Sequence, residues 1–129
     1  MKNILVVSGH GEYATSIRST LEFLAGKNDE IKYIDFTQDD TDITLKDKMQ
    51  KVLDTNIDSG ILFVCDILGG TPFKCAVELS ILKSNIEVVA GCNIESMLET
   101  SFNLGRIDVS ELADLIVESN IKSTIRFKL

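Results

Sequence analysis

His10 and Asp66 are the residues of this sequence whose types and positions suggest chemistry. His10 is the only histidine of the 129-residue chain, and it stands between two glycines directly after an apolar run. Asp66 also follows an apolar run and comes shortly before a Gly-Gly-Thr-Pro sequence. A carboxylate beside an imidazole fixes its tautomer and stabilises its cation, while the other ring nitrogen can act as a nucleophile or base. We therefore predict that His10 and Asp66 form a catalytic pair if the fold brings them together.

The residues around Asp66 predict a strand, a tight glycine loop and a helix. Residues 60–65 form a continuous apolar run bounded by turn residues, which is typical of a strand buried on both faces. Thr71 is a favourable N-cap, and Pro72 would then occupy the first helical position, where its missing N–H costs nothing. Asp66 would lie at the carboxyl end of the strand, beside a helix N-terminus whose free N–H groups favour anions. We expect this loop to form half of an active site.

The remaining chain continues the alternation of strand and helix. Apolar patterning predicts strands at 3–8, 31–36, 60–65 and 86–91, and helices at about 13–25, 43–53, 72–82, 95–104 and 108–120. The apolar faces expected for these helices include Phe23, Ile43 and Leu82. This order implies right-handed crossovers and helices on both faces of the sheet. We predict an α/β fold, with a doubly wound, mainly parallel central sheet flanked by helices, in a single domain spanning 1–129.

The predicted topology also brings the chemistry-bearing residues together. The first and third strands of a doubly wound sheet are commonly neighbours, so the loops after them share one edge of the sheet. His10 and Asp66 can then meet there. The strand at 31–36 alternates more between apolar and polar residues and is expected nearer a sheet edge.

Residues 123–129 form a short, alternating, β-prone tail that does not fit the repeating pattern. A terminal strand of this kind can pair within its own sheet or cross to the sheet of a second copy. We expect a short C-terminal strand here.

Composition excludes several functional classes. The net charge of −7 argues against general binding to nucleic acid or anionic membranes, because both require a basic surface. The N-terminus lacks the features of a signal peptide, and no stretch approaches the ~20 apolar residues of a membrane span. Cys65, Cys75 and Cys92 have no metal-ligand spacing and are expected to be reduced thiols. We therefore expect a cytoplasmic protein that needs neither a metal nor another cofactor.

Two motifs in these predicted loops together resemble a known family. Ser-Gly-His-Gly at 8–11, Asp-Ile-Leu-Gly-Gly-Thr-Pro-Phe at 66–73 and Gly-Cys-Asn-Ile at 91–94 are similar to the EIIA component of mannose-type sugar phosphotransferase systems. This mannose/fructose/sorbose family depends on phosphoenolpyruvate, and the resemblance covers essentially the whole chain.

The resemblance implies a phosphotransferase with a phosphohistidine intermediate. His10 would accept a phosphoryl group from phospho-HPr and pass it to an EIIB component for coupled sugar uptake and phosphorylation. Asp66 would orient His10, and groups around Gly70 and Thr71 would bind the phosphoryl oxygens. The family implies a homodimer that exchanges its C-terminal strand and associates with a membrane sugar permease complex without inserting into the membrane.

Three positions depart from the family pattern. Lys74 stands where the family often has Asn, and Glu95-Ser96 stand where it often has Pro-Met. These residues bear on the shape of the site, and the motifs name neither the sugar nor the EIIB partner. Because the sequence ends at Leu129, we expect EIIB on a separate chain.

Other functions remain as alternatives. The phosphocarrier subunit of a dihydroxyacetone kinase would use the same histidine chemistry, but its second motif usually lacks Gly-Gly-Thr-Pro. A receiver-like regulatory module would be phosphorylated on Asp66, but it needs an acidic pair after the first strand to hold Mg²⁺, where this chain has His10 between glycines. A plain α/β interaction domain, in which His10 has no role, is the third alternative.

Overall fold

Four parallel strands form the sheet of the computed structural model, which describes residues 2–129. The strands lie in the order β2-β1-β3-β4, so β1 and β3 are neighbours as predicted, and β2 is an edge strand. The strands are β1 (Asn3–His10), β2 (Ile31–Phe36), β3 (Gly60–Cys65) and β4 (Ile86–Ala90). The predicted doubly wound α/β fold is confirmed.

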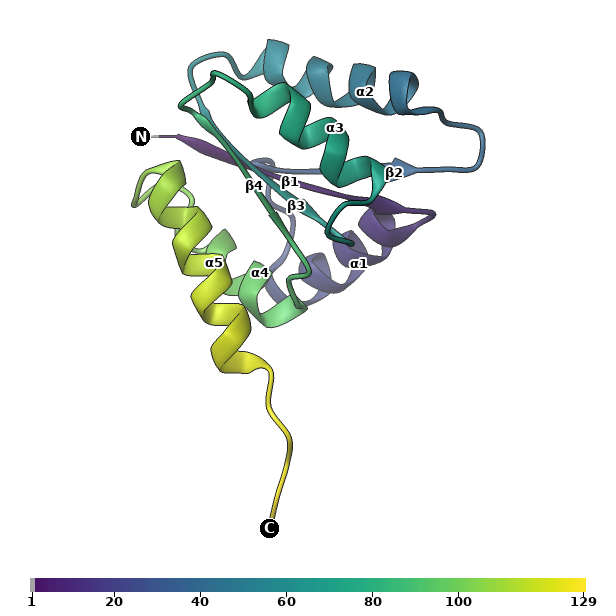
Figure 1. Ribbon diagram of the computed structural model, residues 1–129. Helices are drawn as coiled ribbons and strands as arrows, with labels where there is room; N and C mark the ends of the chain where they lie inside the picture. Colours follow the sequence, from purple (N-terminus) through teal and green to yellow (C-terminus); the bar gives the residue numbers. More distant parts are fainter. Residues whose placement is uncertain (1) are drawn as a thin grey trace.

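Helices cover both faces of the sheet (Figure 1). One face is covered by α1 (Tyr13–Ala25), α4 (Ile94–Ser101) and α5 (Val109–Ser123), and the other by α2 (Asp42–Thr55) and α3 (Thr71–Ser80). No helix within residues 2–129 has the length and apolar character needed to cross a membrane.

The strand sequences explain this three-layered arrangement. In β1, Leu5 and Val7 pack into the core beneath α1, α4 and α5, whereas Ile4 and Val6 pack into the core beneath α2 and α3. Successive side chains of a strand point to opposite faces, so a strand covered on both faces must be apolar at nearly every position. That requirement produces the continuous apolar runs of β1 and β3.

The third helix differs from the prediction at both ends. Gly70, rather than Thr71, is the N-cap of α3, which makes Thr71 the first helical residue and Pro72 the second. The backbone of Gly70 is extended and its carbonyl accepts the Lys74 N–H, so the helical pattern starts one residue early. The helix ends at Ser80, and Leu82 adopts a positive φ of 62° with a fully exposed side chain.

Like Leu82, two further residues assigned to apolar helix faces are exposed instead. Phe23 is 89% exposed and Ile43 is 67% exposed. Phe23 lies two positions beyond the buried Leu21, a rotation of roughly 200° around the helix axis, so it points away from the sheet.

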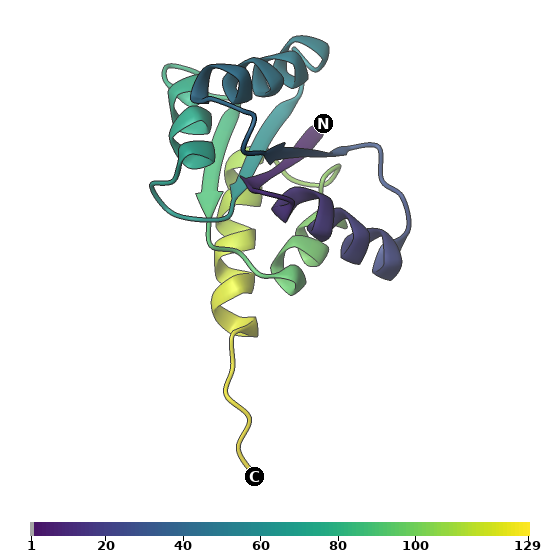
Figure 2. The ribbon, with the colours of Figure 1, turned by 90° about the vertical axis from the view of Figure 1, so that its right-hand side faces the viewer.

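The C-terminal tail forms no strand within this chain. Helix α5 continues to Ser123, and residues 124–129 have neither helical nor strand structure. Figures 1 and 2 show these residues leading away from the rest of the molecule. A strand is stable only when its backbone groups pair with a neighbour, and the isolated tail has no strand beside it. Strand exchange with a second copy stays a prediction.

Candidate active site

His10 and Asp66 meet at the carboxyl edge of the sheet. Strand β1 extends two residues further than predicted, which makes His10 its last residue. Asp66 follows the neighbouring strand β3, and its Oδ2 accepts hydrogen bonds from both the His10 backbone N–H at 2.8 Å and the imidazole Nδ1 at 2.9 Å. The other oxygen, Oδ1, accepts the Ile67 backbone N–H at 2.9 Å. The predicted pair is thus held at both its backbone and its side chain.

The surroundings of the pair keep Asp66 ionised. Burial raises the pKa of the Asp66 carboxyl, but hydrogen bonds from the His10 backbone and imidazole and from the Ile67 backbone together bring the pKa below its ordinary value. An ionised carboxylate only accepts hydrogen bonds, so the Nδ1 of His10 must be the protonated nitrogen. The lone pair is then on Nε2, and 43% of the His10 side chain is exposed to solvent. Nε2 is therefore the ring nitrogen with a free lone pair.

Phe36 is a part of the site that the sequence analysis missed. Its ring meets the His10 ring edge to face, with centroids 5.6 Å apart and an angle of 74° between the planes. Phe36 ends β2 and pairs with His10 across the sheet, and its carbonyl accepts the Gly11 N–H at 2.8 Å. Its place at the end of the predicted edge strand could have located it, because parallel strands end at the same edge.

The glycine loop lies on the other side of His10. Gly69 has a φ of +80°, which allows the loop to turn sharply after β3. A Cβ on Gly70 would lie 2.9 Å from His10 Cε1 and 3.6 Å from Nε2, so the Gly70 backbone lies directly against the imidazole. Thr71 follows as the first residue of α3, although the hydrogen bonds of His10 and Asp66 within residues 2–129 do not include it. The first N–H groups of this helix lack helical carbonyl partners and face an anion favourably.

Burial disfavours the thiolate form of the three cysteines. Cys65 and Cys75 are buried and Cys92 is half-buried. Burial raises the pKa of all three thiols, that of Cys65 to about 12. In the part of the chain that the structure describes, no group of three or more His, Cys, Asp or Glu side chains could hold a metal ion.

Known proteins are similar to this chain in both sequence and fold. The model of the EIIA-man family, described as "PTS system fructose IIA component", matches residues 4–117. The chain belongs to the mannose-type EIIA family. The mannose-specific EIIAB component of Escherichia coli (strain K12) is 35% identical over 98 residues, which are 74% of this chain and 30% of that protein. This chain therefore matches less than a third of the length of that relative.

Further relatives match over more of their length. The sorbose-specific EIIA component of Lacticaseibacillus casei is 26% identical over 88% of this chain and 83% of its own. The crystal structure of an EIIA component from Streptococcus agalactiae has a TM-score of 0.87 at 26% identity and covers 96% of each chain. The mannose/sorbose-specific IIA subunit of Enterococcus faecalis has a TM-score of 0.89 at 22% identity, over 100% of this chain and 97% of its own, and so shares the fold. The expected EIIA family and its fold are confirmed.

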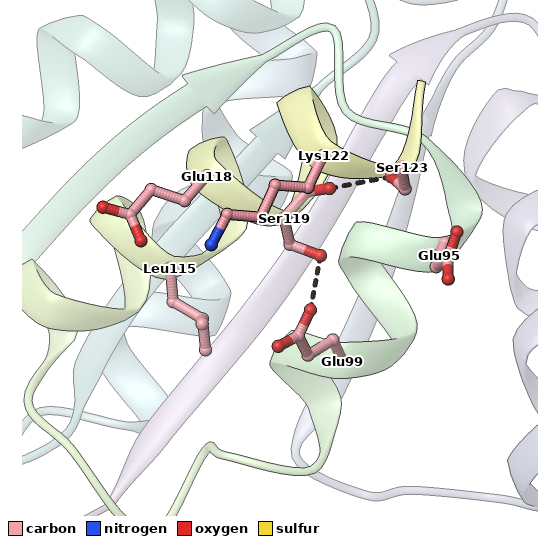
Figure 3. Close-up of a pocket in the computed structure, with 7 residues that line it drawn as sticks. All are labelled: Glu95, Glu99, Leu115, Glu118, Ser119, Lys122 and Ser123. Carbon is pink, nitrogen blue, oxygen red and sulfur yellow. Dashed lines mark hydrogen bonds between the residues drawn. The ribbon is translucent and has the colours of Figure 1, made fainter. Parts of the chain in front are cut away.

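The positions that depart from the EIIA family pattern lie on the first turns of α3 and α4. Glu95 lines a pocket of about 170 Å³ between α4 and α5, next to the hydrogen bond that Ser119 donates to Glu99 (Figure 3). Ser96 is buried in the first turn of α4, where its N–H donates to the side chain of Asn93 at 2.9 Å. Lys74 is exposed on the first turn of α3.

Replacing Gly70 by alanine should impair this EIIA site without unfolding the protein. The backbone of Gly70 is ordinary for any residue, but the added methyl group would press on the imidazole at Cε1. If the imidazole moves to relieve this contact, phosphoryl acceptance should slow roughly 10- to 100-fold. Transfer rates and thermal melts of the two proteins would measure the effect.

Gly105→Ala is the matched control for this change, because its Cβ would meet no atom within 4 Å. It should behave as wild type in both measurements. A Gly70→Ala protein with a wild-type transfer rate would show that the imidazole does not depend on the Gly70 backbone.

The loop at residues 37–40, which follows β2, borders His10 and is held by hydrogen bonds to Asp40. An open cavity of about 390 Å³ is lined by His10, Gly11, Phe36, Thr37, Gln38 and Asp40. The Asp40 carboxylate accepts the Thr37 backbone N–H at 2.9 Å, the Lys48 ammonium at 2.8 Å and the Thr44 hydroxyl at 3.0 Å. The hydrogen bond from Lys48 is the largest of the effects that lower the pKa of Asp40.

The lowered pKa of Asp40 predicts how stability depends on pH. A carboxyl group whose pKa is lower in the folded state stabilises the protein fully above its unfolded value of about 3.9, and loses that contribution as the pH falls through the folded value. Asp40→Asn should therefore lower the melting temperature at pH 7 and reduce the further loss between pH 5 and the acid range. Thermal melts across pH would measure both proteins. Equal acid sensitivity of the two would refute the role of Asp40.

Proposed function

We propose that this EIIA protein carries a phosphoryl group on Nε2 of His10. Phospho-HPr would supply the group, and the EIIB component of a sugar phosphotransferase system would accept it for coupled sugar uptake and phosphorylation. The observation that carries the proposal is the double hydrogen bond from His10 to one oxygen of Asp66, through the backbone N–H and through Nδ1. It fixes the tautomer and leaves Nε2 free to react.

In this mechanism Nε2 attacks the phosphorus atom in line with the bond to the donor. The Nε2–P bond forms as the bond between phosphorus and the donor breaks. The positive charge that develops on the imidazole is balanced by Asp66, which holds the Nδ1 proton throughout. The catalytic contribution is therefore positioning and electrostatics, as in other phosphoryl transfers.

Gly70 and Thr71 would bind the transferred group. The Gly70 backbone lies beside Nε2, and the phosphoryl oxygens would meet the N-terminus of α3 there. Free N–H groups and the positive end of the helix dipole both favour an anion at this place. The Thr71 hydroxyl is available as a further donor.

The alternatives agree less well with the site. In a receiver-like module Asp66 itself would attack phosphorus, yet both of its oxygens already accept N–H groups, from His10 and from Ile67. A carrier for dihydroxyacetone kinase would share the histidine chemistry, but the relatives described above carry the names of mannose and sorbose systems.

The tail also supports assembly as a homodimer. Ile125, Phe127 and Leu129 are exposed and alternate with polar residues, and β4 is an edge strand without a neighbour on its outer side in the part of the sheet described. The tail of one copy would pair with the sheet edge of a second copy and bury these apolar side chains. Truncation after Ser123 should yield a monomer by light scattering, and a truncated protein that remains dimeric would refute the exchange.

Intact mass spectrometry tests the function directly. The wild-type protein would be incubated with phosphoenolpyruvate, enzyme I and HPr, and should gain one phosphoryl group that is labile in acid and stable in base. The ¹⁵N spectrum of the imidazole should place the group on Nε2. The absence of an adduct while HPr becomes phosphorylated would refute the proposal, and an adduct with the lability of an acyl phosphate would favour Asp66 as the acceptor.

A further inference from the structure

Gly9, which directly precedes His10, is a glycine for reasons of space. Its φ lies outside the left-handed region, so its backbone conformation suits any residue. A Cβ at this position would lie 2.6 Å from Cγ and 2.8 Å from Cβ of Tyr13, with the ring atom Cδ1 closer still. Real Cβ atoms essentially never approach other atoms so closely. The Tyr13 ring therefore occupies the space that a side chain of Gly9 would fill.

Tyr13 is well placed to support the end of β1. It is the first residue of α1, and its half-buried side chain packs against the core cluster that contains Val7 of the same strand. Burial first, and then the negative charge of Asp66, raise the pKa of Tyr13 to about 12. The Tyr13 side chain is therefore a neutral, bulky ring at physiological pH. It lies near enough to Asp66 for the carboxylate to raise its pKa.

A displacement of Gly9 would directly disturb the contact between His10 and Asp66. The peptide bond between Gly9 and His10 carries the N–H that donates to Asp66, and the imidazole that donates to the same oxygen is on the next Cα. Adjacent residues of a strand point to opposite faces, so Tyr13 supports β1 from the face opposite to the His10 side chain. A movement of Gly9 would disturb both hydrogen bonds together.

We propose that Tyr13 is a positioning residue for His10. The Tyr13 ring packs on the backbone of Gly9 and fixes the end of β1, so that both the backbone N–H and the Nδ1–H of His10 reach Asp66. The effect on transfer rests on the proposed function of His10, whereas the effect on the imidazole itself does not. The role belongs to the pair, because the ring fits only where position 9 has no side chain.

Four variants test this arrangement: Gly9→Ala, Tyr13→Ala, the double variant, and Tyr13→Phe, with Gly105→Ala as the control. The first readout is the imidazole ¹⁵N spectrum of the unphosphorylated protein, which reports the share of the Nδ1–H tautomer. The second readout is the rate of phosphoryl acceptance from phospho-HPr. Gly9→Ala should reduce the Nδ1–H share and slow acceptance about 10-fold.

The double variant distinguishes steric positioning from a general loss of stability. Tyr13→Ala removes the two closest contacts of the added methyl group, with Cδ1 and Cγ, and keeps the contact with Cβ, so the two changes should be non-additive and acceptance should recover in part toward that of Tyr13→Ala alone. Tyr13→Phe keeps the ring and should retain the wild-type tautomer and rate. Should Gly9→Ala fail to fold, Tyr13→Ala must reduce the Nδ1–H share while Tyr13→Phe retains it.

Unchanged spectra in Gly9→Ala and Tyr13→Ala would overturn the proposal, as would additive losses in the double variant. If the wild type accepts no phosphoryl group but Gly9→Ala still changes the tautomer, the proposed function fails and the positioning role stands.

Discussion

Replacing His10 by alanine should abolish phosphoryl acceptance completely. His10 is the only histidine of the chain, and within residues 2–129 no other candidate nucleophile is both exposed and activated at this edge of the sheet. The thiols have raised pKa values because of burial, and the Asp66 oxygens are occupied by N–H donors. Intact mass after incubation with phosphoenolpyruvate, enzyme I and HPr should show only the unmodified protein.

The fold of the His10→Ala protein should be retained, since the His10 side chain is 43% exposed and is not part of either core cluster. A thermal melt close to that of wild type would therefore accompany the loss of phosphorylation. A phosphoryl adduct that persists in this variant would move the chemistry to Asp66 or to a cysteine, and the receiver-like alternative would then be preferred.

The second large effect should come from Asp66→Asn, which keeps the size of the side chain but removes its charge. The amide can accept a hydrogen bond through its oxygen, but it also carries an NH₂ group and no longer requires a proton on Nδ1 of His10. The Nε2 nucleophile and the stabilisation of the charged imidazole are then both weakened. Loss of the equivalent carboxylate in other Asp–His pairs reduces rates by up to ~10⁴-fold, and we expect about 10²- to 10⁴-fold here.

Stopped-flow or quench-flow transfer from phospho-HPr would measure the Asp66→Asn rate, and the imidazole ¹⁵N spectrum would report the tautomer. Asp114→Asn is a matched control, because Asp114 is exposed on α5, on the opposite side of the sheet from α3. A transfer rate within a few-fold of wild type in Asp66→Asn would show that His10 does not depend on the carboxylate.

The sequence by itself determined the layout of this protein. Strands β1 and β3 contain continuous apolar runs, at residues 4–7 and 61–65, because both faces of the sheet are covered, and that pattern can be recognised without tertiary information. The alternation of strands with helix-length segments restricts the fold to a parallel sheet with helices on both faces. Because parallel strands end at a common edge, and the first and third strands of a doubly wound sheet are commonly neighbours, the sequence predicted that His10 and Asp66 lie together.

Tertiary structure decided the details on which the chemistry depends. The two hydrogen bonds between His10 and Asp66 span 56 positions of the chain, and they require the final register of β1 against β3. The edge-to-face contact of Phe36 and the ring of Tyr13 on Gly9 likewise depend on how β2 and α1 pack against β1. Local patterns indicate which elements form, but they do not fix contacts between elements at the level of single atoms.

Tertiary structure also determined where helices and strands begin and end. The N-cap of α3 is Gly70 because of the backbone conformation of the loop, although Thr71 is the better N-cap by residue type. The tail from 124 to 129 has the alternation of a strand but no neighbouring strand within its own chain. A strand exists only through its pairing, so residue type can favour one at this position, but only a neighbouring strand with a free edge can form it.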